Sequence, residues 1–265
     1  MLKRLNNIWA YRKVLNTLVR RDLRVRYSRS FLGYLWTVIE PLANALIYFV
    51  VFALIFKRRD DPGHSPYFLF LLTGLLPWQW FNASVSETMR ALLAEAKLVR
   101  STSLPRELWV IRVVIAKGIE FVFSLPVLIF FVIWYAIMGP TVLNWQLIYI
   151  PVALFLEFML LIGIGLLLAP TTVLVTDIQP SVRIVLRIMF YLTPIIYLIH
   201  EAPGPLMVML WFNPMSAVLE LFRAGFFKAE IAWHPVVGGT FTTLLFVLIG
   251  FVTFARLEKS VLKEI

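Results

Sequence analysis

Residues 20–56 read RRDLRVRYSRSFLGYLWTVIEPLANALIYFVVFALIF. A dense basic run ends at Arg29, and an apolar run long enough to cross a bilayer begins at Gly33. Nine of the 25 Lys and Arg residues of the chain lie before Ser30. Because positive charge is retained on the cytoplasmic side, this stretch predicts a first helix that crosses outward from a cytoplasmic N-terminus.

The composition indicates a multispanning membrane protein. Of the 265 residues, 60% are hydrophobic and only 15% are charged, whereas soluble domains carry about a quarter charged residues. A net charge of +10 would suggest nucleic-acid binding in a soluble protein. Here membrane orientation explains that charge, so no nucleic-acid partner is expected. The absence of cysteine excludes disulfides and thiolate metal sites.

The pattern of apolar runs and turn signals predicts an all-α integral membrane protein with one domain over residues 1–265. An amphipathic helix lies at the cytoplasmic surface within residues 1–32, where Asp22 interrupts the apolar face and argues for contact with protein as well as lipid. Six transmembrane helices are expected at 33–56, 67–86, 108–138, 147–175, 184–199 and 236–255. Six crossings place both termini in the cytoplasm.

The segments between the spans carry their own signals. Residues 87–107 form a cytoplasmic connection in which MRALLAEAKLV (89–99) has a helical composition. The external segment 200–234 is apolar but punctuated by prolines, which favours two short re-entrant helices near Pro205–Trp211 and Pro214–Phe227. Pro77 is expected to kink or break the second span, and residues 256–265 to form a short cytoplasmic helix.

Carboxylates inside spans are expensive to bury and are the first candidates for function. Glu40, Glu120 and Glu157 fall within predicted spans, where they would form a proton or cation pathway. The alternative is structural: interhelical hydrogen bonds, or a pair between Lys117 and Glu120 one turn apart. The chain has no GxxxxGK[ST] motif and no HExxH motif, so nucleotide binding by a P-loop and metal catalysis have little support.

Aromatic residues are the second group of candidates. Tyr34, Tyr48 and Phe52 share one face of the first span, and Phe49 lies beside them. A pore lined by aromatic rings would stack on sugar faces, whereas the alternative is packing against lipid and at the membrane interfaces.

Four motifs carry a family resemblance. They are RRDLRVRYSRSFLGYLWTVIEPL at 20–42, GLLPWQWF at 74–81, TDIQPSVRIVLRIMFYLTPIIY at 176–197 and NPMSAVLELFRAGFF at 213–227. With these motifs the chain resembles the transmembrane permease subunit of type-2 ABC exporters, in the branch that exports lipid-linked polysaccharides such as O-antigen, teichoic acid, capsule and galactan.

The resemblance implies a set of partners and roles. The protein would be a transport subunit in the cytoplasmic membrane and not an enzyme by itself. Two copies would form the pore, and two copies of a separate P-loop ATPase subunit would bind ATP and Mg, so this chain would carry no cofactor or metal. Residues 1–32 would contain the interface helix, residues 87–107 the coupling helix that docks into the ATPase, and residues 200–234 two gate helices.

The resemblance also implies roles for individual residues. Those expected to line the channel are Tyr34, Tyr48, Phe49 and Phe52. Contact with the ATPase subunit is expected from Arg90, Glu95 and Lys97. Arg26, Tyr27 and Arg29 would meet the lipid pyrophosphate at the entrance, since guanidinium groups suit phosphate geometry.

Three alternatives remain open at this point. The same architecture would serve a drug or lipid exporter. A stand-alone membrane enzyme acting on polyprenyl-linked sugars would need paired catalytic residues at one membrane face. A proton-coupled transporter would use Glu40, Glu120 and Glu157.

Overall fold

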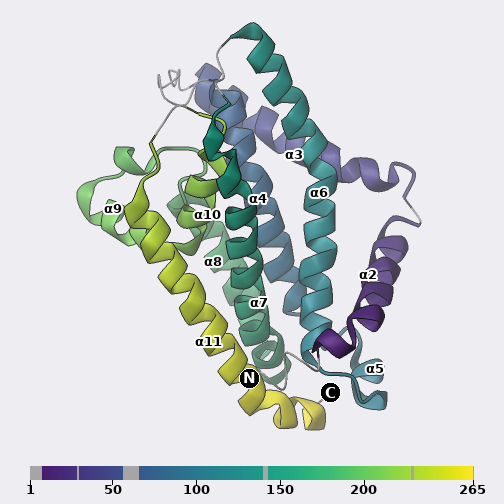
Figure 1. Cartoon of the computed structure of the whole chain (residues 1–265). Coiled ribbons are helices and arrows are strands. Elements are labelled where there is room, and N and C mark those ends of the chain that lie inside the picture. Colours follow the sequence, from purple (N-terminus) through teal and green to yellow (C-terminus); the bar gives the residue numbers. More distant parts are fainter. Residues whose placement is uncertain (1–7, 29, 56–65, 140–142, 228–229, 265) are drawn as a thin grey trace.

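The computed structural model describes residues 8–28, 30–55, 66–139, 143–227 and 230–264, and every regular element among them is a helix (Figure 1). The α-helices are α2 (Arg12–Tyr27), α3 (Trp36–Tyr48), α4 (Tyr67–Thr88), α5 (Ala96–Ser101), α6 (Glu107–Met138), α7 (Ile150–Leu174), α8 (Ile178–Leu192), α9 (Gly204–Trp211), α10 (Pro214–Arg223) and α11 (Trp233–Glu264). A π-helical segment, Phe49–Ile55, continues α3. Short 3₁₀ turns precede α3 at Gly33–Leu35 and α7 at Trp145–Tyr149.

Four helical segments of the described chain are long and apolar enough to cross a membrane: Gly33–Val51, Glu107–Met138, Trp145–Leu174 and Trp233–Glu264. The pair α9 and α10, bent by 86°, would make a fifth if it counts as one span. The all-helical membrane fold is therefore confirmed. The predicted spans at 67–86 and 184–199 correspond to α4 and α8, which are not among these candidates.

Helix α4 lies at the centre of the bundle, between α6, α7 and α10 (Figure 1). It is apolar around its circumference, as expected of a helix surrounded by protein. Most of its side chains are buried, including Pro77. Of the predicted kink or break at Pro77, the break is wrong, because α4 continues as one helix from Tyr67 to Thr88, and the kink stays a prediction.

The most extensive helix contact joins α7 and α11, which run side by side in the same direction (Figure 1). A Cβ atom added to Gly163 would lie 2.7 Å from the backbone carbon of Phe246, and one added to Gly250 would collide with the carbonyl of Gly163. The two backbones touch because both positions lack a side chain, as in other membrane helix pairs with small residues at the interface.

The short helices α9 and α10 confirm the two predicted for 200–234, with bounds that differ by a few residues. Pro214 occupies the first turn of α10, and the Asn213 side chain caps that helix by accepting a hydrogen bond from the Met215 amide at 3.0 Å. A proline in the first turn and an asparagine at the N-cap are both favourable for starting a helix. Together they start α10 at the bend of 86° between α9 and α10.

The end of α8 corrects the fifth predicted span. The helix runs from Ile178 to Leu192 instead of 184–199, and Thr193 is extended at φ −86° and ψ 141°. A proline disfavours helical geometry at the residue before it, so Pro194 ends α8. The buried Arg223 of α10 donates to the carbonyls of Pro194 and Ile195, at 2.6 and 2.7 Å, and so fixes the chain that leaves α8.

Two smaller predictions also need correction. The segment 89–99 is not one helix, because the chain turns through residues 89–95 and α5 begins only at Ala96. The C-terminal residues form no separate helix, since nothing after Gly250 breaks α11 before Glu264. The amphipathic helix predicted within residues 1–32 is α2, whose Val19 and Leu23 are buried near Ala116 of α6.

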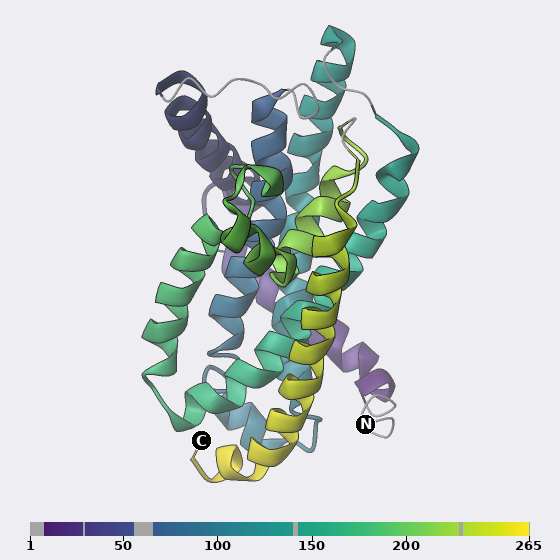
Figure 2. The same ribbon diagram turned by 90° about the vertical axis from the view of Figure 1, so that its left-hand side faces the viewer.

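The end of the bundle where α5 lies, called here the α5 end, gathers distant parts of the chain. Figure 1 shows α2, α5 and the end of α11 together at this end of the molecule. Figure 2 shows α8 rising from the same end along one side of the bundle. Residues from the N-terminal segment, the middle of the chain and the C-terminus can therefore meet here.

Candidate functional site

Two clusters of ion pairs tie α2 to the rest of the α5 end, and together they are called the charge network. In the first cluster, Arg112 of α6 contacts Asp22 of α2 at 3.1 Å and Glu95 at 3.3 Å. Arg21 bonds to the same two carboxylates. Arg112 has 4% of its side chain exposed. The prediction that Asp22 marks a protein contact is confirmed.

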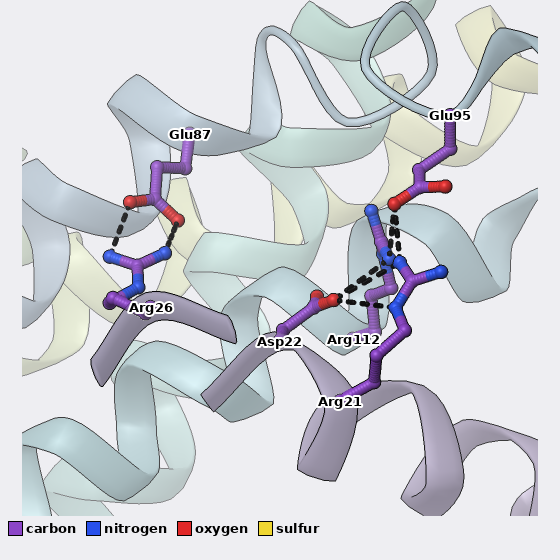
Figure 3. Close-up of polar contacts among 6 residues, drawn as sticks. All are labelled: Arg21, Asp22, Arg26, Glu87, Glu95 and Arg112. Atoms are coloured by element: carbon purple, nitrogen blue, oxygen red, sulfur yellow. Dashed lines mark hydrogen bonds and ion pairs between the residues drawn. The ribbon is translucent and has the colours of Figure 1, made fainter. Parts of the chain in front are cut away.

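In the second cluster, Arg26 of α2 forms an ion pair with Glu87 at the end of α4. Its two terminal nitrogens donate to the two carboxylate oxygens at 2.7 and 2.6 Å (Figure 3). This fork-to-fork geometry is the strong form of an arginine–carboxylate pair. Lys117 of α6 contacts Glu87 at 3.0 Å and Glu120 at 2.9 Å, which confirms the predicted Lys117–Glu120 pair.

The ionisation of these groups follows from their partners. Burial alone would raise the pKa of Glu87, but the bonds from Arg26 and the charge of Lys117 outweigh it and hold that pKa below its ordinary value. Burial likewise opposes the charge of Arg21, yet hydrogen bonds to Glu95 and Asp22 raise its pKa. Both groups are therefore charged at neutral pH, and the network joins α2, α4, the 89–95 connection and α6 electrostatically.

A cavity of about 870 Å³ opens beside the charge network. It lies between α2, the end of α4, the 89–95 connection, α6 and α8. Five arginines and three carboxylates line it: Arg21, Arg26, Arg90, Arg112, Arg183, Asp22, Glu87 and Glu95. The lining therefore carries a surplus of positive charge, which suits an anionic ligand.

A second cavity of about 160 Å³ lies between α3, α4 and α6. Its walls include Tyr27, Glu40, Gln79, Lys117 and Glu120. The buried Nε2 of Gln79 has no hydrogen-bond partner in the described part of the chain. The cavity is polar and has room for a few water molecules.

The predicted channel residues are not gathered in one place. The ring of Tyr34 lies 4.3 Å from that of Tyr27 and 5.3 Å from that of Phe123, at the joint between α2 and α3. Tyr48 instead faces Phe190 of α8 at 5.4 Å. Phe49 faces Phe68 of α4 at 5.5 Å. The side chain of Phe52 lies outside the described residues.

Sequence reasoning missed the aromatic partners of Tyr48. Phe190 lies 5.6 Å from Trp78 of α4 and 5.2 Å from Tyr191, and more than half of the Tyr191 side chain is exposed. These rings form an aromatic cluster across α3, α4 and α8. The adjacent aromatic pair within the 176–197 motif was a signal that could have pointed to it.

The residues expected to contact an ATPase subunit have different surroundings. Lys97 on α5 is exposed, together with Leu93 and Leu98. Glu95 faces inward to Arg21 and Arg112. Arg90 donates from Nε to the Gln179 side chain of α8 at 3.1 Å. Of the three, Lys97 and Arg90 are exposed, and Glu95 is half-buried.

The residues expected at the lipid entrance lie at the joint of α2 and α3. Arg26 is held by Glu87 and also contacts Glu120 at 3.2 Å. Tyr27 lines the 160 Å³ cavity and packs on Tyr34. Arg29 lies outside the described residues.

Of the intramembrane carboxylates, Glu157 of α7 is the most enclosed. Its side chain is fully buried, and neither carboxylate oxygen has a hydrogen-bond partner within the described residues. The hydrogen-bonded alternative foreseen for it is not seen. Across the described ranges, no group of three or more His, Asp or Glu residues could hold a metal ion.

Comparison with known protein families identifies the architecture. Residues 13–227 match the ABC-2 type transporter family. The chain belongs to the ABC-2 type transporter family. The match begins in α2 and ends just after α10, so it includes the charge network, the α5 segment and the bent helix pair. As an ABC-2 membrane protein the chain is the permease component of a transporter, and it is not the catalytic subunit.

Curated relatives extend the match to almost the whole chain. An O-antigen export system permease protein, RfbA of Klebsiella pneumoniae, is 30% identical over 92% of each chain. The polysialic acid transport protein KpsM of Escherichia coli is 25% identical over 92% of this chain and 93% of its own. The capsule polysaccharide export inner-membrane protein CtrC of Neisseria meningitidis is 24% identical over 97% and 96%.

Proposed function

We propose that this ABC-2 permease exports a lipid-linked polysaccharide across the cytoplasmic membrane, driven by a separate ATPase subunit. The observation that carries the proposal is the full-length similarity to permeases named for O-antigen, polysialic acid and capsule export. Long polysaccharides are hydrophilic, so their passage needs a pore with polar and aromatic walls in place of lipid. The resemblance assigns Tyr34, Tyr48, Phe49 and Phe52 to those walls.

The proposed topology has six crossings with both termini in the cytoplasm. The α5 end is then cytoplasmic, which agrees with the nine Lys and Arg residues before Ser30. Helix α4 makes the second crossing, where neighbouring helices shield it. Helix α8 makes the fifth, and its 15 residues rise about 22 Å. That is short of the roughly 30 Å hydrocarbon core, so the non-helical residues after Leu192 would complete the crossing.

The proposed contact with the ATPase is made by the 87–107 segment. Support comes from the exposed Leu93, Lys97 and Leu98, which present an apolar and cationic surface at the cytoplasmic side. The charge network then links this surface to α2, because Glu95 binds Arg21 and Arg112. If the 87–107 segment moves on ATP binding, the ion pairs of Glu95 would transmit that movement to α2 and α6 together. In this arrangement two copies of the permease and two of the ATPase, which holds ATP and Mg, form the exporter.

A pull-down from native membranes tests the proposal. The tagged chain is solubilised in mild detergent, and co-purifying proteins are identified by mass spectrometry. We expect a stoichiometric P-loop ATPase, and ATP-dependent glycan transport when both subunits are reconstituted. Purified permease that hydrolyses ATP alone, or that recovers no ATPase while other membrane complexes survive, would contradict the proposal.

A second experiment addresses the substrate class. Tyr48 and Phe190 contact each other across α3 and α8, so their replacement by alanine removes one side of the aromatic cluster. We expect reduced glycan export with the ATPase still bound. Unchanged export would argue against an aromatic glycan pathway at this place and would favour a drug or lipid substrate.

A further inference from the structure

Helix α11 continues past the length that a bilayer needs. Its 32 residues rise about 48 Å, whereas the hydrocarbon core is about 30 Å thick. The crossing expected at 236–255 accounts for that thickness, and residues 256–264 continue the same helix beyond it. These residues are called here the α11 extension. Figures 1 and 2 both show them at the lower tip of the molecule, within the α5 end.

One side of the α11 extension is packed against the bundle. Val261 is buried in the same apolar cluster as Val99 of α5 and Trp109 of α6. Glu258 pairs with Arg106, which immediately precedes α6, at 3.9 Å. The extension is therefore packed as part of the α5 end, in one cluster with the segment that we propose to contact the ATPase.

The opposite side of the α11 extension carries a stripe of positive charge. At about 100° per residue, Arg256, Lys259 and Lys263 fall within an arc of about 60°, and all three are exposed. Glu258 and Glu264 lie outside this arc. Because the packed side faces the bundle, the stripe faces away from it, which is toward the cytoplasm in the proposed topology.

Two simpler explanations account for less of this arrangement. The positive-inside rule explains cations after the last crossing, but it does not place them on one side of a packed helix. Anionic lipid attracts basic helices that lie in the interface plane with their apolar side in the membrane. The apolar side of the α11 extension is instead covered by protein, since Val261 packs in the cluster of Val99 and Trp109.

The stripe continues a surface that α5 already exposes. Lys97 and Arg100 of α5 are exposed at the same end of the molecule, together with Leu98. Exposed cations from two helices of one cluster thus adjoin an exposed leucine. Such a surface fits the acidic, partly apolar face of a soluble protein, because complementary charge steers association and apolar contact adds buried area. A protein that binds α5 from the cytoplasm would meet the stripe as well.

We propose that Arg256, Lys259 and Lys263 form a second docking surface for the ATPase subunit, which meets them with acidic side chains. This inference rests on the proposed function and adds the end of α11 to the contact made by the 87–107 segment. The packing of Val261 and the ion pair of Glu258 join the two surfaces, so the docked ATPase holds α5, α6 and α11 as one unit.

Binding of the co-purifying ATPase subunit to the full chain in nanodiscs tests the inference. Association and dissociation rates are measured at two salt concentrations in neutral lipid, and again with anionic lipid. The test variant is Arg256→Gln/Lys259→Gln/Lys263→Gln. The matched control removes the same charge from three exposed positions of α2 at the same end of the molecule, in the variant Lys13→Gln/Arg20→Gln/Arg24→Gln. Thermal unfolding verifies that both variants fold.

We expect the test variant to weaken ATPase binding about tenfold in neutral lipid, mainly through slower association, and to reduce the salt dependence of binding. The three charges are removed together because each exposed ion pair contributes little by itself. The control should bind the ATPase like wild type. Lys259→Arg/Lys263→Arg, which keeps the charge of the stripe, should also bind like wild type.

Three results would overturn the inference. Binding of the test variant equal to that of wild type would leave the stripe without a role in docking. Equal weakening in the control would indicate a general charge effect. Weakening that occurs only with anionic lipid would make the stripe a lipid contact. If wild-type permease captures no ATPase at all, the proposed function fails instead, whatever the variants do.

Discussion

Replacing Arg223 by methionine should loosen the junction between α8, α10 and α4. Its guanidinium donates to the carbonyls of Pro194, Ile195 and Phe70, at 2.6, 2.7 and 3.2 Å, and lies 3.7 Å from the Phe70 ring centre. At about 1.5 kcal/mol for each bond from a charged donor, the three bonds contribute about 4.5 kcal/mol. Removing the buried charge also removes its desolvation cost, which offsets part of this loss. The free energy of unfolding should therefore fall by roughly 3 kcal/mol.

Thermal unfolding followed by tryptophan fluorescence measures the effect. For a chain of this size each kcal/mol corresponds to about 2–4 °C, so the melting temperature of Arg223→Met should fall by about 6–12 °C. Arg256→Met, at an exposed position on α11, is the control and should melt like wild type. Arg223→Lys should be intermediate, because one ammonium replaces a planar fork that reaches two chain segments.

Gly74 of α4 lies against the same Arg223 guanidinium. A Cβ atom at Gly74 would collide with the Arg223 guanidinium and lie 3.0 Å from the Ile195 carbonyl oxygen. Gly74→Ala should therefore destabilise the protein, but less so when Arg223 is already methionine. Two results would refute a stabilising role for the hydrogen bonds from Arg223 to the carbonyls. One is a melting temperature of Arg223→Met within 2 °C of the Arg256→Met control. The other is that the effects of Gly74→Ala and Arg223→Met on the melting temperature are additive.

Three further predictions concern other parts of the bundle. Gly163→Ala should cost about 1–3 kcal/mol, because its Cβ meets the backbone of α11 and not a movable side chain; Gly204→Ala, with open space around it, is the control in the same melting assay. Glu157→Gln should preserve or raise thermal stability and leave transport intact, since the buried carboxyl has no partner among the described residues; loss of transport would instead favour the proton-pathway reading. The lowered pKa of Glu87 makes a contribution that is present above its unfolded pKa and lost as the pH falls through its folded pKa. Melting temperature should consequently drop below about pH 4.5 in wild type and fall less steeply in Glu87→Gln; identical pH profiles would exclude this ion pair as a source of acid sensitivity.

The sequence predicts the helical membrane fold because each apolar run is long and the residues that end it are its neighbours in the chain. Apolar runs, prolines and glycines mark α3, α6, α7 and α11, and the Asn213-Pro214 cap marks α10. Local signals fail where the outcome depends on tertiary neighbours. The composition of residues 89–99 favours a helix, yet the chain turns there, and Glu95 meets arginines of α2 and α6. Which apolar side chains of α2 are buried likewise depends on its contact with α6.

The candidate site is predicted less completely than the fold. The Lys117–Glu120 pair follows from helical spacing alone, and it is confirmed. The fork between Arg26 and Glu87 joins residues 61 positions apart, and no single sequence reveals such a pair. The surplus positive charge of the cavity appears only after Arg21, Arg26 and Arg112 have been paired with their carboxylates. Both features depend on how helices pack, which spacing along one chain does not encode.

The contact between Gly163 and Gly250 has a mechanical consequence for α11. This helix is held at Gly250 by the backbone of α7, touches Asn213 and Ala217 through Gly239, and pairs Glu258 with Arg106 at 3.9 Å near its other end. A rod gripped near its middle resists sliding and responds to a push by pivoting. Glu258 lies about 12 Å and Gly239 about 16 Å from the pivot at helical rise. If α11 turns as a rigid rod about Gly250, a sideways shift of Glu258 moves Gly239 in the opposite direction by about 1.4 times as much, which would couple the two ends of the molecule.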